Sequence, residues 1–231
     1  MDNRYYFEKI ENNLVTLTGG EAQHLCRVRR AKVGDEIVAF NGDGEDYILS
    51  ISSIQKDKVE ATLKEKRTNR AGGDANITVY LAMLKNEALT TAIDNLAELN
   101  VKKVKLFKSD FSVAQIEEKK LDKLKNIAIQ ASKQSERATV MDIEIINKKD
   151  VSTDILNYKN RFFAYEDSTG KIESFNGDFA VIIGPEGGFS PSEVEEFSKV
   201  AKNVSLGKTI LRAEVACVVA VSTLKVVNNE G

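Results

Sequence analysis

The hydrophobic pattern of the first 70 residues is that of short β-strands. Apolar and polar positions alternate in LVTLTG, DEIVAFNGDG, DYILSISSI and KVEATLKEK, and Gly, Asn and Asp separate these runs. The segment GDGEDY, directly after IVAF, is typical of a hairpin turn, and only EAQHLCRV indicates a short helix. These features predict a small β-barrel or compact sheet over residues 1–70.

The pattern changes after KRTNRAGGDAN, a polar and glycine-containing stretch near residues 67–76 that we interpret as a linker. From residue 77 on, strand-like runs such as ITVYLAML, VKKVKLFKS and DFAVIIG alternate with segments whose apolar residues recur at helical spacing, such as LTTAIDNLAELN and LDKLKNIAIQASKQSER. This alternation favours an α/β domain with a mostly parallel sheet, which we place over residues 76–229.

A glycine-rich turn, GPEGG at residues 184–188, follows the strand-like run FAVII and precedes a well-marked helix start. Ser190 is a natural N-cap, Pro191 suits the first helical position, and Glu193 completes a capping box. Loops at the carboxyl ends of strands in α/β sheets are where ligands bind. The spacing matches neither GxGxxG nor GxxxxGK[ST], so on spacing alone a structural turn and a binding loop stay equally open.

A second unit of strand, glycine and helix follows in VSLGKTILRAEVACVVAVSTLKVV, with Gly207 at its turn. Apolar residues are nearly continuous from Val215 to Val221, so we expect the last helix to be buried on several sides and to pack against another subunit. Two such units close together are a more specific signal for a ligand site than either alone.

Composition and charge narrow the class of protein. A chain of 231 residues with 42% hydrophobic and 29% charged residues is typical of a globular protein of two compact domains. Its longest apolar run is too short for a membrane span and its start, MDNRYYFEK, lacks the apolar stretch of a signal peptide, so we expect a cytoplasmic protein without a membrane partner. Cys26 and Cys217 lie far apart without CxxC spacing, which predicts neither a disulfide nor a zinc site.

The net charge of −2 does not indicate a nucleic-acid binder, so any such role must rest on local patches. One candidate patch is RVRRAK, with Arg27, Arg29, Arg30 and Lys32, and a second runs from Lys119 through Lys125 to Lys133 and Arg137. On its own, such a cluster is more typical of a solvated basic surface than of a nucleic-acid-binding site.

The two glycine units together closely resemble the signature of a known family. IGPEGGFSPSE and LGKTILRAEVA resemble the SPOUT superfamily of knotted methyltransferases and, within it, the RsmE family, which methylates N3 of a uridine in small-subunit ribosomal RNA. HLCRVRRAKVGDEI, LKNEALTTAIDNLAELNV and ASKQSERATV resemble further family segments, so the likeness covers nearly the whole chain. Five positions depart from the family pattern. Asn100 stands where the family usually has glycine, Phe111 where it has arginine, and Met141 where it has proline. Ala213 and Val215 stand where it has threonines.

The resemblance implies an N-terminal PUA-like β-barrel and a C-terminal α/β domain with a deep trefoil knot. It also implies a homodimer that binds S-adenosylmethionine (SAM) in the glycine loops beside the subunit interface. The implied substrate is small-subunit ribosomal RNA or the assembled 30S subunit, and the implied activity is SAM-dependent methylation of uridine N3 without a metal ion.

From the chemistry that this implied activity requires, we assign site residues. For the cofactor they are Ile183, Gly184, Pro185, Gly188, Leu206, Gly207, Leu211 and Ala216. For catalysis they are Arg137 and Arg212 near the target base, and Glu186 and Glu214 as candidate proton acceptors. For phosphate contacts they are Arg27, Arg29, Arg30, Lys32 and Lys85.

Alternatives stay open for several of these residues. Arg212 could form an ion pair with Glu214 or another carboxylate, Glu186 could order its own turn, and the lone His24 is assigned RNA contact at most. Two rival functions also stay open. One is a nucleotide- or NAD-dependent enzyme, against which the missing glycine spacings count. The other is a catalytically silent RNA-binding or ribosome-assembly protein of the same fold, for which Phe111 and Ala213 leave room.

Overall fold

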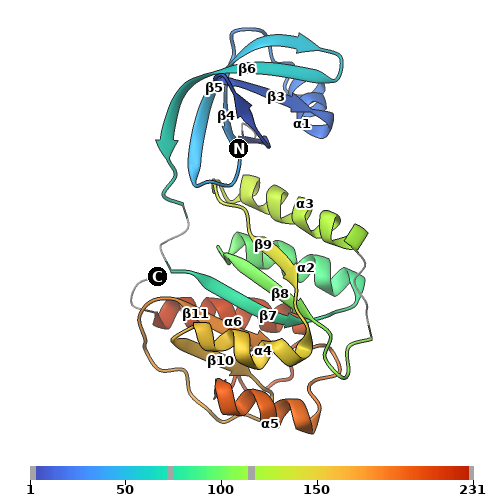
Figure 1. Cartoon of the computed structure of the whole chain (residues 1–231), viewed down its shortest axis with the longest axis vertical. Helices are drawn as coiled ribbons and strands as arrows, with labels where there is room; N and C mark the ends of the chain where they lie inside the picture. The colour runs from blue at the N-terminus through green and yellow to red at the C-terminus, as the bar shows by residue number, and fades with distance from the viewer. Residues whose placement is uncertain (1–3, 72–74, 114–117, 229–231) are drawn as a thin grey trace. The chain divides into compact units, whose positions relative to one another are not determined.

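The computed structural model describes residues 4–71, 75–113 and 118–228, and the chain forms two compact units (Figure 1). The first unit comprises Met1–Ala71 and Ser132–Val140, and the second comprises Gly72–Ala131 and Met141–Gly231. The segment 132–140, which we expected within the second domain, therefore groups with the first unit.

The first unit is built on one six-stranded sheet in the order β1-β4-β5-β6-β3-β2. β1 pairs with β4 in parallel and the other neighbours are antiparallel. The strands are β1 (Arg4–Tyr6), β2 (Ile10–Glu11), β3 (Leu14–Thr18), β4 (Glu36–Phe40), β5 (Glu45–Gln55) and β6 (Lys58–Thr68). The β-rich first domain is thus confirmed, and the hairpin turn expected at GDGEDY joins β4 to β5.

Alternation along these strands builds the core of the first unit. In β3 the residues alternate between exposed and buried, which places Val15 and Leu17 in a cluster with Tyr5, Phe7 and Tyr47. A short helix, α1 (Gly19–Gln23), continues into a π-helical turn (His24–Val28) where the expected short helix lies, and Leu25 of this turn is buried in the same cluster.

The second unit is a six-stranded, wholly parallel sheet in the order β12-β10-β11-β7-β8-β9. Its strands are β7 (Ile77–Ala82), β8 (Lys103–Phe107), β9 (Asp142–Ile145), β10 (Asn160–Ala164), β11 (Phe179–Ile183) and β12 (Lys202–Val204). Every residue of β7 and β11 is buried, as continuous apolar runs in the centre of a parallel sheet require.

Helices follow the strands along the chain. They are α2 (Asn86–Glu98), α3 (Glu118–Gln134), α4 (Lys148–Asp154) with a 3₁₀ turn (Ile155–Asn157), α5 (Pro191–Val200) and α6 (Ala213–Val227). Residues of α4 and α5 share an apolar cluster with Tyr80 of β7 and Ile182 of β11. α6 packs against α2 and β11 (Figure 1). The α/β architecture expected from the sequence is therefore confirmed.

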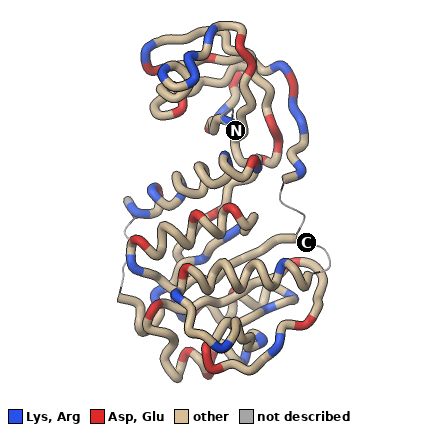
Figure 2. Tube along the Cα trace, turned by 180° about the vertical axis from the view of Figure 1, so that it is seen from behind, with Lys and Arg blue, Asp and Glu red and all other residues tan. Residues whose placement is uncertain are grey.

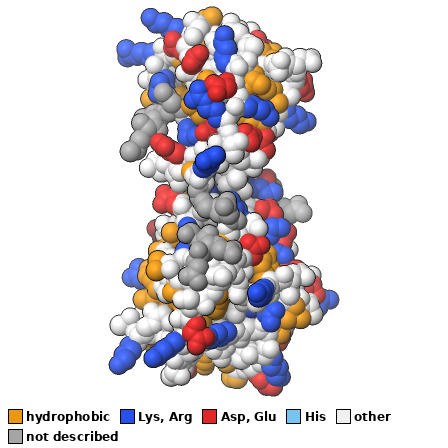
Figure 3. Space-filling view, turned by 90° about the vertical axis from the view of Figure 1, so that its left-hand side faces the viewer, with side chains coloured by type: hydrophobic (Ala, Val, Ile, Leu, Met, Phe, Trp, Pro, Cys, Tyr) orange, Lys and Arg blue, Asp and Glu red, His pale blue; other side chains and the backbone are white. Residues whose placement is uncertain are grey.

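The surface carries both signs of charge. Lys and Arg positions are interspersed with Asp and Glu along the trace of each unit in Figure 2, and the face drawn in Figure 3 shows the same mixture with hydrophobic side chains between. Among the described helices, none has the length and apolar character that crossing a membrane requires.

Candidate active site

A pocket of about 850 Å³ lies in the second unit, at the carboxyl ends of four neighbouring strands. Loops after β7, β10, β11 and β12 and the first turns of α2 and α6 line it. All these strands are parallel, so their carboxyl ends meet at one edge of the sheet, where ligands of α/β proteins bind. The residues that we assigned to the cofactor all line this pocket: Ile183, Gly184, Pro185, Gly188, Leu206, Gly207, Leu211 and Ala216.

The loop after β11, residues 184–190, is fixed at its far end by the start of α5. The capping box is confirmed: Ser190 Oγ accepts a hydrogen bond from the Glu193 N–H, and the Glu193 carboxylate accepts one from the Ser190 N–H. Pro191 occupies the first turn, as the sequence predicted. Phe189 is buried in the apolar cluster that α5 covers, so the loop is bound to the core by an aromatic ring.

Two positions of this loop require glycine for steric reasons. A Cβ atom added at Gly184 would lie 2.7 Å from Cε2 of Phe189, so the ring packs directly on the glycine backbone. Gly188 has φ +71°, in the left-handed region that favours glycine, and its N–H donates to the Pro185 carbonyl. The sequence GPEGG therefore encodes a tight turn that presents its backbone to the pocket.

The second loop, residues 205–212, offers main-chain donors. Within the described part of the chain, the N–H groups of Leu206 and Leu211 have no hydrogen-bond partner, and both residues border the pocket. Gly207 has φ +121° and nothing within 4 Å of an added Cβ, so the loop is open at that point. These donors suit a ligand with acceptor atoms along its edges.

Three of the four predicted catalytic residues border the same pocket. Arg212 is the N-cap of α6 and is exposed, and among the described residues no ion pair joins it to a carboxylate. Glu214, in the first turn of α6, is half-buried. Glu186 accepts a hydrogen bond from the Lys85 N–H at 3.0 Å, so it ties its own turn to the start of α2. This contact favours the alternative that Glu186 orders the loop.

Arg137, the fourth predicted catalytic residue, does not line this pocket. It lies in the first unit, is only 2% exposed, and its Nη2 donates to Ser132 Oγ at 3.2 Å. Burial lowers the pKa of its guanidinium to about 10. The predicted role of Arg137 at the target base stays a prediction.

The predicted phosphate-binding residues fall into two groups. Lys85 lines the pocket of the second unit. Arg27, Arg29, Arg30 and Lys32 are all exposed on the π-helical turn of the first unit and the residues after it. His24, in the same turn, lies 3.4 Å from the Tyr5 hydroxyl through Nδ1.

Part of the pocket wall was not predicted from the sequence. Ala164, Tyr165 and Glu166, at the end of β10, line it. A signal is present in the sequence, because the run RFFAYED is strand-like and its polar end must lie at the same edge as the other strand ends. In the described residues no group of three or more His, Cys, Asp or Glu side chains could hold a metal ion.

Comparison with known proteins agrees with this geometry. A family model described as an RNA methyltransferase domain matches residues 73–225, and one described as an RNA methyltransferase PUA domain matches residues 17–64. Ribosomal RNA small subunit methyltransferase E of Rickettsia conorii is 30% identical over 241 residues, covering 98% of this chain and 96% of the relative. The chain belongs to the ribosomal RNA small subunit methyltransferase E (RsmE) family.

Solved structures support the fold. A probable rRNA methyltransferase from Porphyromonas gingivalis has a TM-score of 0.87 at 27% identity, with 98% of each chain covered. An RsmE protein from Neisseria gonorrhoeae, solved bound to SAM, has a TM-score of 0.86 at 23% identity and the same coverage. The PUA-like first domain and the α/β second domain are those of the RsmE family.

The departures from the family pattern have local explanations at two positions. Asn100 has φ +61°, the left-handed conformation that explains the usual glycine and that Asn tolerates better than most residues. Phe111 is 48% exposed, and its Cβ would lie 3.1 Å from a Cβ added at Gly187, so it packs against the outside of the 184–190 loop. The usual arginine at position 111 is thus replaced by a side chain that covers the loop.

Proposed function

We propose that this protein is a SAM-dependent methyltransferase that methylates N3 of a uridine in small-subunit ribosomal RNA. One observation carries the proposal: in a chain of the RsmE family, both glycine loops, Arg212 and Glu214 border a single pocket at the carboxyl edge of the parallel sheet.

The residues of the pocket fit SAM. Its volume of about 850 Å³ falls within the usual range for small-molecule sites, and the free N–H groups of Leu206 and Leu211 can bind the edge of an adenine. Carboxylates of Glu166 and Glu214 border the pocket and complement a cationic sulfonium and ammonium group. When bound, SAM supplies an electrophilic methyl group.

The chain itself has two chemical tasks, to accept the N3 proton and to stabilise the negative charge that this leaves on the uracil carbonyl oxygens. We assign the first to Glu214, because Glu186 already accepts the Lys85 N–H. We assign the second to Arg212, whose exposed guanidinium has no ion pair within the described residues and suits an oxyanion.

The RNA is held by positive side chains. We assign phosphate contacts to Lys85 at the pocket and to the exposed Arg27, Arg29, Arg30 and Lys32 of the first unit. The N3 edge of the uridine must be free of base pairing to enter the pocket, so the target lies in a single strand or is flipped out.

We also propose that the protein is a cytoplasmic homodimer. The loop before α6 and the helix itself carry exposed apolar side chains: Ile210 is 90% exposed, Val215 41% and Val226 85%. A second copy packed on α6 would cover them. Light scattering at micromolar concentration tests this, and a monomeric mass would contradict it. The trefoil knot implied by the family resemblance stays a prediction.

The deciding experiment uses SAM labelled in its methyl group. The protein is incubated with small-subunit ribosomal RNA transcribed in vitro and, separately, with small subunits reconstituted on that RNA, and the modified nucleoside is identified by mass spectrometry. We expect labelled 3-methyluridine at one position, mapped as a stop of reverse transcription because the methyl group blocks base pairing.

Each other outcome has a definite meaning. Label on another base or on a ribose oxygen would contradict the uridine N3 assignment. Binding of SAM without label in either substrate would favour the silent RNA-binding alternative, and preferential binding of NAD or ATP would favour the nucleotide-dependent enzyme. Arg212→Ala is the control, because it should keep SAM binding and slow methyl transfer about 10²-fold.

A further inference from the structure

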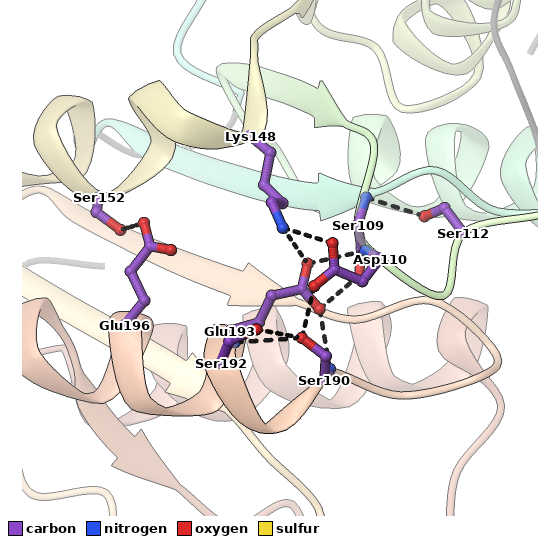
Figure 4. A network of polar contacts seen from close by, with 9 residues as sticks. All are labelled: Ser109, Asp110, Ser112, Lys148, Ser152, Ser190, Ser192, Glu193 and Glu196. Carbon is purple, nitrogen blue, oxygen red and sulfur yellow. Dashed lines mark hydrogen bonds and ion pairs between the residues drawn. The ribbon is translucent and has the colours of Figure 1, made fainter.

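A polar cluster surrounds the end of the 184–190 loop where α5 begins (Figure 4). Its members come from three places far apart in the sequence: Ser109 and Asp110 follow β8, Lys148 begins α4, and Ser190 and Glu193 begin α5. The cluster therefore links the end of the 184–190 loop to two other elements of the second unit.

Glu193 makes more contacts than a capping box requires. Its side chain is only 1% exposed, and Oε2 accepts hydrogen bonds from the Ser190 N–H at 2.9 Å and from Ser109 Oγ at 3.0 Å. Oε1 accepts a hydrogen bond from the Asp110 N–H at 3.0 Å. A buried carboxylate with these partners fixes the end of the loop relative to β8.

Lys148 lies between two carboxylates. Its Nζ donates to Asp110 Oδ1 at 2.5 Å and lies 3.8 Å from Glu193 Oε1, while Asp110 Oδ2 accepts a hydrogen bond from Ser190 Oγ at 2.6 Å. Glu196, one turn further along α5, is bonded to Ser152 instead. Without the ammonium group, two neighbouring carboxylates would repel each other at the point where the loop is attached.

We propose that Lys148, Asp110 and Glu193 are positioning residues that hold the 184–190 loop in its ligand-binding shape before SAM arrives. The inference rests on the proposed function of the pocket. A loop that is already ordered avoids the free-energy cost of ordering on binding. If the loop were competent in only a tenth of the molecules, the apparent Kd for SAM would rise about tenfold.

The test is Lys148→Met, which keeps the aliphatic stem and removes the charge. We expect the Kd and the KM for SAM to rise about tenfold with kcat little changed, because the reacting groups are untouched. Hydrogen exchange of the amides in residues 184–190 should become faster in the SAM-free protein. Lys148→Arg should behave as the wild type.

Two further variants separate positioning from general stability. Lys148→Met with Asp110→Asn removes one charge of each sign, and the Asn carbonyl can still accept from Ser190 Oγ, so SAM affinity should recover. Lys199→Met is the matched control, because it breaks an ion pair of 2.7 Å within α5, the helix that Glu193 begins, and both side chains of that pair are largely exposed. This control should leave SAM affinity and loop exchange unchanged.

The outcomes are distinguishable from failure of the proposed function. Unchanged loop exchange and SAM affinity in Lys148→Met, equal changes in Lys199→Met, or no recovery in the double variant would each overturn the inference. If the wild type binds no SAM at all, the proposed function fails, and exchange of the 184–190 amides in the ligand-free variants still decides whether the cluster holds the loop.

Discussion

Gly184→Ala is the most direct perturbation of the 184–190 loop, because the added methyl group meets a buried ring. The new Cβ would lie 2.7 Å from Cε2 of Phe189 and 3.1 Å from its Cδ2 and Cζ. Ordinary contacts begin at 3.4 Å, so the ring or the backbone must move by about 0.7 Å. The ring cannot move freely, since Phe163 and Phe197 pack edge-on against it with centroids 5.0 and 5.6 Å away.

The expected cost follows from overpacking a rigid core. Such insertions lower the free energy of unfolding by about 1–3 kcal/mol. For a chain of this length, a loss of about 2 kcal/mol lowers Tm by roughly 4–8 °C. The backbone at Gly184 borders the pocket, so its displacement should also weaken SAM binding. Both effects have the same steric origin.

The assay is thermal unfolding with and without SAM, combined with calorimetric SAM binding. Gly20→Ala is the control, because an added Cβ there has nothing within 4 Å and the backbone has no positive φ. Phe189→Leu provides the stricter test: it replaces the ring that the methyl group meets with a smaller side chain, so Gly184→Ala should cost less when combined with Phe189→Leu than in the wild type. Strictly additive costs would refute the steric explanation.

Four other predictions address separate parts of the molecule. Arg212→Ala should lower kcat about 10²-fold with SAM affinity unchanged, and an unchanged kcat would exclude it as the oxyanion donor. Arg30→Ala should weaken RNA binding and reduce the slope of log K against log salt by about 1 without changing SAM affinity, whereas an unchanged slope would remove it from the RNA-binding surface. The hydrogen bond from Lys148 holds the pKa of the Asp110 carboxyl below its ordinary value, so this stabilisation is present at neutral pH and is lost as the pH falls through the depressed pKa. Acid unfolding of Lys148→Met should accordingly show a smaller loss of unfolding free energy between about pH 6 and pH 2 than the wild type. Burial raises the pKa of the Cys217 thiol to about 12, so alkylation at about pH 8 followed by mass spectrometry should leave it unmodified until the protein unfolds.

Local sequence signals were reliable where a few neighbouring residues decide the structure. The capping box at Ser190 and Glu193, the hairpin turn before β5 and the buried central strand β11 follow from short-range hydrogen bonding and from the period of apolar residues. The two glycine loops were also recognisable, because tight turns need glycine at particular positions. Their common membership in one pocket required the parallel sheet, which brings the ends of β11 and β12 to one edge.

Side-chain roles were harder to predict, because partners distant in the sequence decide them. The hydrogen bond that Glu186 accepts from the Lys85 N–H, across 101 residues of sequence, could not be predicted. It is the observation behind our choice of Glu214 as the proposed base. Arg137 resembles a functional arginine of the family, yet the structure buries it in the first unit beside Ser132. Neither contact can be predicted from the periodicity or the spacing of neighbouring residues.

By itself, the sequence determined the division into two domains, the alternation of strands and helices in the second domain, both glycine loops and the family resemblance. Each of these depends on residues within one element or one turn. Only the tertiary structure decided which charged side chains border the pocket, that Tyr165 and Glu166 complete its wall, and that Lys148 lies between Asp110 and Glu193. The physical reason is that hydrogen bonds and ion pairs act over a few ångströms in space. Folding brings such partners together from positions that lie far apart in the chain.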